Sequence, residues 1–146
     1  MTASTHQLIL QEQIYSAYKQ VASLVDAAID KLSSAGVGVG NKDSCKLALT
    51  EAINNVIEHA YDESIKEIID LKILLSDEEI VFHLTDSGKP VDPAMFEGRR
   101  FSLPEDDMAT GGWGLYLIHE LMDDIRYYSL DGENHLVIIK WRDINE

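Results

Sequence analysis

Hydrophobic residues in the first third of the chain follow two different spacings. Residues 6–11 are predicted to form a short strand, and from Gln13 onward the apolar positions recur at steps of three and four. Such steps form the buried stripe of a long amphipathic helix, and here the stripe comprises Ile14, Tyr18, Val21, Val25, Ala28 and Leu32. Three glycines within residues 36–40 interrupt the pattern and are interpreted as a connector. A second helix is predicted from Asp43, a suitable N-cap residue, to about Tyr61.

Beyond residue 70 the hydrophobic spacing drops to two. Two alternating apolar sets, separated by the polar turn SDEE, predict a pair of antiparallel strands at 71–75 and 80–84. Residues 86–110 contain all three prolines and no regular pattern. Irregular segments of this length are usually functional, often as lids over a site. A helix is then predicted at 114–122, followed by strands at 125–130 and 135–141 around the turn DGEN.

This order of elements predicts the fold class. Strands that cluster with mainly antiparallel neighbours, and helices stacked against them, indicate an α/β (α+β) two-layer sandwich. We expect a mixed, mainly antiparallel sheet with the helices packed on one face. A single domain spanning residues 1–146 is expected, because the length suits one core and no linker or repeat interrupts the chain.

Charge and cysteine content narrow the classes of function. Twelve Lys and Arg residues against 26 Asp and Glu residues give a net charge of −14, which disfavours direct contact with nucleic acid or an anionic membrane. A protein partner with a basic face would suit this charge, and so would an acidic surface kept only for solubility. Cys45 is the single cysteine, so no internal disulfide or thiolate metal cluster can form, and we expect it to be a buried apolar residue. No stretch resembles a secretion signal or a membrane span, and the cytoplasm is the expected location.

The predicted second helix carries polar residues at helical spacing. They fall at i, i+4, i+7 and i+8 and so share one stripe, which consists of Glu51, Asn55, Glu58 and His59. The amide oxygen of Asn55 can bind Mg²⁺, a hard cation that accepts neutral oxygen ligands beside phosphates. The carboxylate of Glu51 can orient or deprotonate a nucleophile that attacks a γ-phosphate. Taken alone, these residues fit an ordinary solvated helix face equally well.

Two later segments could complete a nucleotide site. Asp86 follows an apolar strand, and Gly88 would let a flat ring approach the backbone, although the same residues are also typical of a plain turn. Gly111, Gly112 and Gly114 lead into the predicted third helix. Backbone N–H groups at a helix N-terminus can hold phosphate oxygens, while a glycine-rich hinge is the alternative. No GxxxxGK[ST] stretch occurs, which excludes a P-loop.

In this order and spacing the three segments resemble the GHKL ATPase superfamily, which includes gyrase, Hsp90, histidine kinases and MutL. Within it they are most similar to the anti-sigma factor serine-protein kinases. The motifs are E-A-x-x-N-x-x-x-H-A-Y at 51–61, D-x-G-x-P-x-D-P at 86–93 and G-G-W-G-L-Y-L-I at 111–118. The pair Met122 and Asp123 also fits, and the resemblance covers essentially the whole chain.

The resemblance implies ATP and Mg²⁺ as ligands. It makes Glu51 the catalytic base and Asn55 the ligand of a Mg²⁺ ion that bridges the phosphates. Asp86 would accept a hydrogen bond from the adenine amino group, with Gly88 beneath the ring. Residues 96–110 would form the lid, and the phosphates would be held by the backbone amides of Gly112, Trp113, Gly114 and Leu115. His59 would either brace the helix or approach the nucleotide.

The implied function is that of a regulatory kinase. Such a protein binds a sigma factor and phosphorylates a serine or threonine of a STAS-domain anti-anti-sigma protein, and a homodimer is compatible with the family. Some members carry an arginine immediately before the lid glycines, where this chain has Met108, Ala109 and Thr110. The nearby cations that could substitute are Lys89, Arg99 and Arg100.

This departure bears on phosphoryl transfer more than on ATP binding. It leaves open a nucleotide-dependent binding module that sequesters a protein partner with little or no kinase activity. A third possible function is the regulation of a target protein other than a sigma factor.

Overall fold

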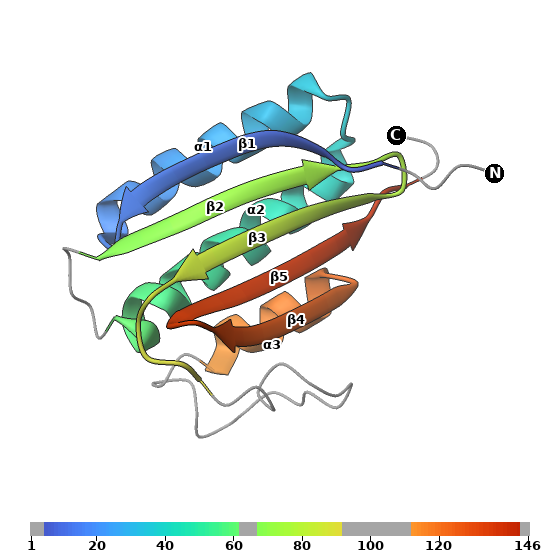
Figure 1. The fold of residues 1–146 in the computed structure, drawn as a ribbon. Helices are drawn as coiled ribbons and strands as arrows, with labels where there is room; N and C mark the ends of the chain where they lie inside the picture. The colour runs from blue at the N-terminus through green and yellow to red at the C-terminus, as the bar shows by residue number, and fades with distance from the viewer. Residues whose placement is uncertain (1–4, 62–66, 92–111, 144–146) are drawn as a thin grey trace.

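The computed structural model describes residues 5–61, 67–91 and 112–143. Its strands are β1 (Gln7–Tyr15), β2 (Ile68–Leu75), β3 (Glu79–Asp86), β4 (Asp124–Leu130) and β5 (Glu133–Trp141). Its helices are α1 (Tyr18–Ser34), α2 (Val39–Asn55) and α3 (Gly112–Leu121), and a π-helical turn η1 (Val56–Ala60) continues α2. The strands form one sheet in the order β1-β2-β3-β5-β4, and the three helices cover one face of it (Figure 1).

The predicted two-layer sandwich is confirmed, with one refinement. All four pairings between the described strands are antiparallel, so no parallel component of a mixed sheet is found among them. The two predicted strands at 71–75 and 80–84 pair with each other, and both are longer than predicted. Because β3 extends to Asp86, this carboxylate belongs to the sheet rather than to a turn that follows it.

The predicted helix start at Gln13 is wrong, because β1 continues to residue 15. Ile14 pairs with Ile69 of β2, and this backbone pairing with a distant strand outweighs the local helical spacing. α1 begins only at Tyr18, whose side chain is 46% exposed and does not join the buried stripe. The remainder of the predicted stripe is buried, namely Val21, Val25, Ala28 and Leu32.

The prediction of a glycine-rich connector at 36–40 is wrong for residues 39 and 40, which are helical. α2 begins at Val39 with Gly38 as the N-cap, upstream of the predicted cap Asp43, so that Gly40 lies inside the helix. Gly36 does break the chain, since its φ of 87° is a conformation that side chains disfavour. The buried face of α2 carries Cys45, Ala48, Leu49, Ala52 and Ile53, which places Cys45 in the core as expected.

The C-terminal hairpin is tighter than predicted. Asp131 and Gly132 have φ angles of 54° and 81°, the pair of positive values that a two-residue turn between antiparallel strands requires. The predicted four-residue DGEN turn is therefore wrong in its second half, because residues 133 and 134 already belong to β5. α3 begins at Gly112 instead of residue 114 and ends one residue early, at Leu121.

The hydrophobic core lies between the sheet and its helices. It is filled by alternate residues of β2 and β3, which pack against the apolar stripes of α1 and α2. Among the residues whose burial is described, the largest fully buried side chain is Phe82 at the centre of β3. Within the described part of the chain, no helix is long and apolar enough to cross a membrane.

Candidate functional site

The predicted site residues lie on adjoining elements. Glu51 and Asn55 occupy the last turns of α2, and Asp86 is the final residue of β3. η1 touches the segment that follows β3, because the Lys89 N–H donates to the Ala60 carbonyl oxygen over 2.8 Å. Figure 1 shows η1 and the end of β3 on the same side of the molecule. α3, which starts at Gly112, packs beside α2.

Glu51 has a raised pKa. Burial raises the pKa of this carboxyl above the ordinary glutamate value, and the negative charge of Glu58 raises it further. A carboxylate that takes up a proton more readily than usual is suited to act as a general base. The helix therefore supplies a proton acceptor one turn before Asn55.

Asn55 carries an unsatisfied amide group. Its Nδ2 atom is buried and finds no hydrogen-bond partner among the described residues. Buried amide donors are normally paired, so this atom marks a place for an acceptor such as a phosphate oxygen or a water molecule. The carboxamide oxygen of the same side chain is a suitable Mg²⁺ ligand. The residue thus fits a metal–phosphate group, and its role stays a prediction.

The helix widens immediately after Asn55. In η1 the Tyr61 N–H donates to the Val56 carbonyl oxygen over 3.1 Å, which is the five-residue step of a π-helix. A wider turn changes the angle between successive side chains, so the regular spacing predicted for Glu58 and His59 does not continue through it. His59 Nε2 lies 3.8 Å from Glu58 Oε2, and its side chain is 41% exposed, an arrangement that favours a role within the helix.

Asp86 is a buried acceptor with one oxygen engaged. Its Oδ1 accepts the Gly88 N–H over 2.9 Å and the Asn134 amide over 2.8 Å. Burial raises the pKa of Asp86, while these two hydrogen bonds and the charge of His135 oppose the rise. Both described hydrogen bonds to the side chain end on Oδ1. Oδ2 is therefore the atom that could accept from an adenine amino group.

The structure gives a different physical reason for Gly88. A Cβ atom at this position would collide with the Ala60 carbonyl oxygen, and it would lie 2.7 Å from the Ala60 carbonyl carbon and 2.8 Å from Tyr61 Cδ1. The missing side chain is thus required where the segment after β3 meets the end of η1. Close approach of a nucleobase remains a prediction for this residue.

Asn134 contacts the candidate site but is absent from the predicted site residues, because the sequence pattern places it in the hairpin turn. In the structure it lies in β5 opposite Asp86 and is 3% exposed. Its Nδ2 also donates to the Gly88 carbonyl oxygen over 2.9 Å, and its Oδ1 accepts the Ser129 hydroxyl over 2.7 Å. A signal for it exists in the sequence: a two-residue Asp131–Gly132 turn puts residue 134 on the strand face shared with Leu136.

The described residues include only part of the predicted phosphate-binding segment and none of the predicted lid. Gly112, Trp113, Gly114 and Leu115 form the first turn of α3, where backbone N–H groups point out of the helix. The predicted lid at 96–110, Gly111 and the stretch before the lid glycines lie outside the described residues. Arg99 and Arg100 lie outside them as well.

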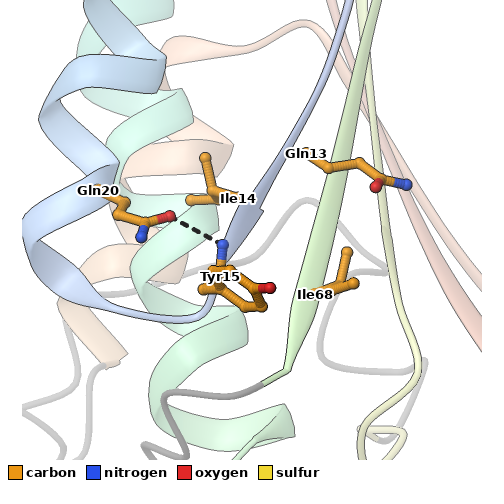
Figure 2. Close-up of a pocket in the computed structure, with 5 residues that line it drawn as sticks. All are labelled: Gln13, Ile14, Tyr15, Gln20 and Ile68. Carbon is orange, nitrogen blue, oxygen red and sulfur yellow. Dashed lines mark hydrogen bonds between the residues drawn. The ribbon is translucent and has the colours of Figure 1, made fainter.

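A separate hollow of about 390 Å³ lies where β1, α1 and β2 meet (Figure 2). Two of its lining residues are joined by a hydrogen bond from the Tyr15 N–H to Gln20 Oε1 over 2.8 Å (Figure 2). Among the described residues its lining consists of Gln13, Ile14, Tyr15, Gln20 and Ile68, which include no carboxylate, no cationic side chain and no predicted site residue. The described part of this lining therefore offers none of the charged groups that a metal–nucleotide site needs.

Known proteins resemble this chain in sequence and in fold. A family model described as the histidine kinase-like ATPase domain matches residues 14–141. The serine/threonine-protein kinase BtrW of Bordetella bronchiseptica is 32% identical over 92 residues, covering 63% of this chain and 65% of BtrW. The serine-protein kinase RsbW of Bacillus thuringiensis is 31% identical over 119 residues, covering 72% of this chain and 71% of that kinase.

The fold has a solved counterpart. The crystal structure of the RsbU and RsbW domains of a Mycobacterium tuberculosis protein matches with a TM-score of 0.64, covering 92% of this chain and 32% of the other. At 14% sequence identity this likeness supports the fold alone. The family model, by contrast, spans most of the sequence. The chain therefore belongs to the histidine kinase-like ATPase domain family, in the group of the RsbW and BtrW serine-protein kinases.

Proposed function

We propose that this protein is an ATP-dependent serine/threonine protein kinase that acts as an anti-sigma factor in a partner-switching pathway. In that role it binds a sigma factor in the cytoplasm and phosphorylates a STAS-domain anti-anti-sigma protein. The observation that carries the proposal is the pair Glu51 and Asn55, one helical turn apart and linked through η1 to Asp86. Relatives that are serine-protein kinases support the enzyme class.

The adenine end of the nucleotide is assigned to β3 and β5. Asp86 is buried and keeps Oδ2 available, while Asn134 and the Gly88 N–H hold Oδ1 in place. A buried acceptor facing an amino group discriminates strongly against bases that lack one, because the acceptor would then be left unpaired. These side chains support recognition of adenine.

The phosphate end is assigned to α2 and the first turn of α3. Asn55 would hold Mg²⁺ through its oxygen, and its buried amide nitrogen would donate to a phosphate oxygen. The backbone N–H groups at Gly112–Leu115 would complete the cradle. Bound Mg²⁺ would neutralise the charge that develops on the phosphates.

The reaction assigned to Glu51 is proton transfer from a hydroxyl group. The partner's serine or threonine oxygen attacks the γ-phosphorus, and the bond from that phosphorus to the β–γ bridging oxygen breaks, so that ADP leaves. The hydroxyl proton passes to the Glu51 carboxylate, whose raised pKa favours its retention. This chain's own contribution is thus to place a proton acceptor beside the phosphates.

The first test compares Glu51→Gln with the matched variant Glu58→Gln at pH 8. Both replace a carboxylate with an amide of the same size on the same helical segment. We expect Glu51→Gln to bind ATP–Mg²⁺ nearly as well as wild type while phosphate transfer to a STAS-domain acceptor falls by roughly two to four orders of magnitude. Glu58→Gln should retain wild-type transfer at this pH, because Glu58 acts on Glu51 through its charge and is assigned no part in the transfer itself.

Binding and transfer are measured on the same samples, by calorimetry and by transfer of the γ-phosphoryl group to the acceptor. Wild-type transfer by Glu51→Gln would refute the base assignment. ATP binding by the wild-type protein without any transfer would instead support the partner-sequestering module, which the Met-Ala-Thr stretch at 108–110 favours.

A further inference from the structure

Tyr61, the last residue of the H-A-Y stretch, lies at a junction of three elements. Its side chain is 7% exposed. The hydroxyl donates to the Ile68 carbonyl oxygen at the start of β2 over 2.7 Å. It also accepts the N–H of Ser87, the residue after Asp86, over 2.7 Å. One phenol group therefore links the end of η1 to the start of β2 and to the first residue after β3.

The hydrogen bond to the Ile68 carbonyl oxygen needs a neutral phenol, because the hydroxyl must keep its proton to donate it. Burial raises the pKa of Tyr61, and the nearby carboxylates of Asp86 and Glu67 raise it further, whereas the hydrogen bonds with Ser87 lower it. The net rise keeps the hydroxyl protonated at neutral pH. It can then donate to one backbone group and accept from another at the same time.

Two more contacts hold the segment after β3, residues 87–89, against η1. The Lys89 N–H donates to the Ala60 carbonyl oxygen over 2.8 Å. Gly88 packs so closely on Ala60 and on the Tyr61 ring that no Cβ atom would fit. Residues 87–89 are therefore held on the end of the helix at three successive positions.

This junction determines where the adenine acceptor lies relative to the phosphate groups. Asp86 Oδ1 takes its orientation from the Gly88 N–H, and Gly88 is held by η1. Glu51 and Asn55 are on α2, which runs directly into η1. A nucleotide that reaches from Asp86 to Asn55 would thus span the contact between η1 and residues 87–89, which the Tyr61 hydroxyl helps to hold.

We propose that Tyr61 is a positioning residue for adenine recognition, whose hydroxyl holds residues 87–89 on the end of η1 so that Asp86 faces the nucleobase while Asn55 faces the phosphates. This inference rests on the proposed ATP site. It predicts a base-specific loss when the hydroxyl is removed, because the phosphate groups are held by other residues.

The test uses Tyr61→Phe, which keeps the buried ring and removes the hydroxyl. Dissociation constants are measured for ATP and for purine riboside triphosphate, which lacks the 6-amino group. We expect wild type to prefer ATP, and Tyr61→Phe to bind ATP about three- to tenfold more weakly with little change for the analogue. In the kinase assay KM for ATP should rise while kcat stays within about twofold.

Tyr127→Phe is the matched control. The Tyr127 hydroxyl accepts the Val91 N–H over 3.0 Å, so this variant also removes a phenol contact to the segment after β3, but beyond the residues that hold Asp86. Its ratio of ATP affinity to analogue affinity should equal that of wild type. An equal fall in that ratio for both variants would overturn the role of Tyr61.

The outcomes separate this inference from the proposed function. No ATP binding by wild type, or no preference for the 6-amino group, would refute the proposed adenine site itself. A normal wild-type preference that Tyr61→Phe retains, or an equal loss for both ligands, would overturn only the inference. Amide hydrogen exchange of wild type adds a test that needs no variant: the Ser87 N–H should be protected without nucleotide, and rapid exchange would contradict the hydrogen bond to Tyr61.

Discussion

At the scale of single residues, the site depends on how each ionisable group is surrounded. Glu51 and Asp86 both have raised pKa values, and burial is the largest cause for each. The two carboxyl groups differ in the neighbours that change the pKa further. Asp86 is held by two hydrogen bonds that favour its charged form, whereas Glu51 faces the charge of Glu58, which favours protonation. This difference suits a fixed acceptor at Asp86 and a proton-accepting base at Glu51.

Glu58→Gln should alter the pH dependence of phosphate transfer. The charge of Glu58 raises the pKa of Glu51, so its removal lowers that pKa and keeps the base ionised at lower pH. The acidic limb of the kcat profile should therefore move to lower pH, while the rate well above it is unchanged. Burial, the larger cause, remains, so we expect part of the raised pKa to persist. A profile identical to that of wild type would show that Glu51 does not govern this limb.

At the scale of elements, the site depends on the contact between η1 and the segment after β3. The two meet through backbone atoms at Ala60, Gly88 and Lys89, and backbone cannot move aside as a flexible side chain can. Strand and helix are thereby locked together at the point where both contribute site residues. Adding one methyl group at this contact is therefore expected to displace both the end of η1 and the segment after β3.

Gly88→Ala should destabilise the protein by roughly 1–3 kcal/mol, because the added Cβ collides with the Ala60 carbonyl group. It should also weaken ATP binding, since Asp86 Oδ1 accepts the N–H of this residue. Urea unfolding and calorimetric titration with ATP measure the two effects.

Gly40→Ala provides the matched comparison. This glycine lies inside α2, and a Cβ atom there would meet no described atom within 4 Å apart from its chain neighbours and the nearby backbone of its own helix. Alanine favours a helix over glycine by up to about 1 kcal/mol, so this variant should be as stable as wild type or more so. Equal stability losses in both variants would contradict the steric explanation for Gly88.

At the scale of the whole molecule, the helices of the described residues all lie on one face of the sheet, and none of them covers the opposite face (Figure 1). On that face His83 Nε2 lies 2.9 Å from His135 Nδ1, which joins the central strands β3 and β5. The His135 ring also stacks on Tyr128 of β4, with centroids 4.7 Å apart. Nothing in the sequence brings these rings together, since they meet only through the pairing of two distant strands.

The histidine pair should make the stability of the whole domain depend on pH. Burial lowers the pKa of His83, and the neighbouring His135 and Lys72 lower it further, against the opposing charge of Asp70. Between the lowered folded pKa and the ordinary histidine pKa, His83 binds a proton more readily in the unfolded chain than in the folded protein. This contribution to stability is present above the ordinary histidine pKa of about 6.5 and is lost as pH falls toward the lower folded value.

Urea unfolding of wild type and His83→Gln at pH 8 and pH 5.5 measures this effect. We expect wild type to lose more free energy of unfolding on acidification than the variant does. The raised pKa values of Glu51 and Asp86 act in the opposite sense at lower pH, but they are common to both proteins and cancel in the comparison. An equal pH dependence in the two proteins would contradict the prediction.

Much of the architecture follows from local patterns. Alternation at 71–75 and 80–84 specifies strands, and the three- and four-residue steps from Val21 to Leu32 specify a helix, because each pattern matches the geometry of one element. The motifs at 51–61, 86–93 and 111–118 also indicated the family, which the match over residues 14–141 confirms. The roles of Glu51, Asn55 and Asp86 stay predictions, which rest on the side-chain chemistry that these short, ordered motifs carry.

What the sequence determined by itself was thus the succession of elements, the single buried cysteine and the chemistry of the motifs. Only the tertiary structure decided that Ile14 lies in a strand, that Gly88 must lack a side chain, and that Asn134 and Tyr61 hold the segment around Asp86. The physical reason is distance along the chain. Periodicity reports which face of an element is buried, whereas hydrogen bonds between β3, β5 and η1 join residues that share no local pattern.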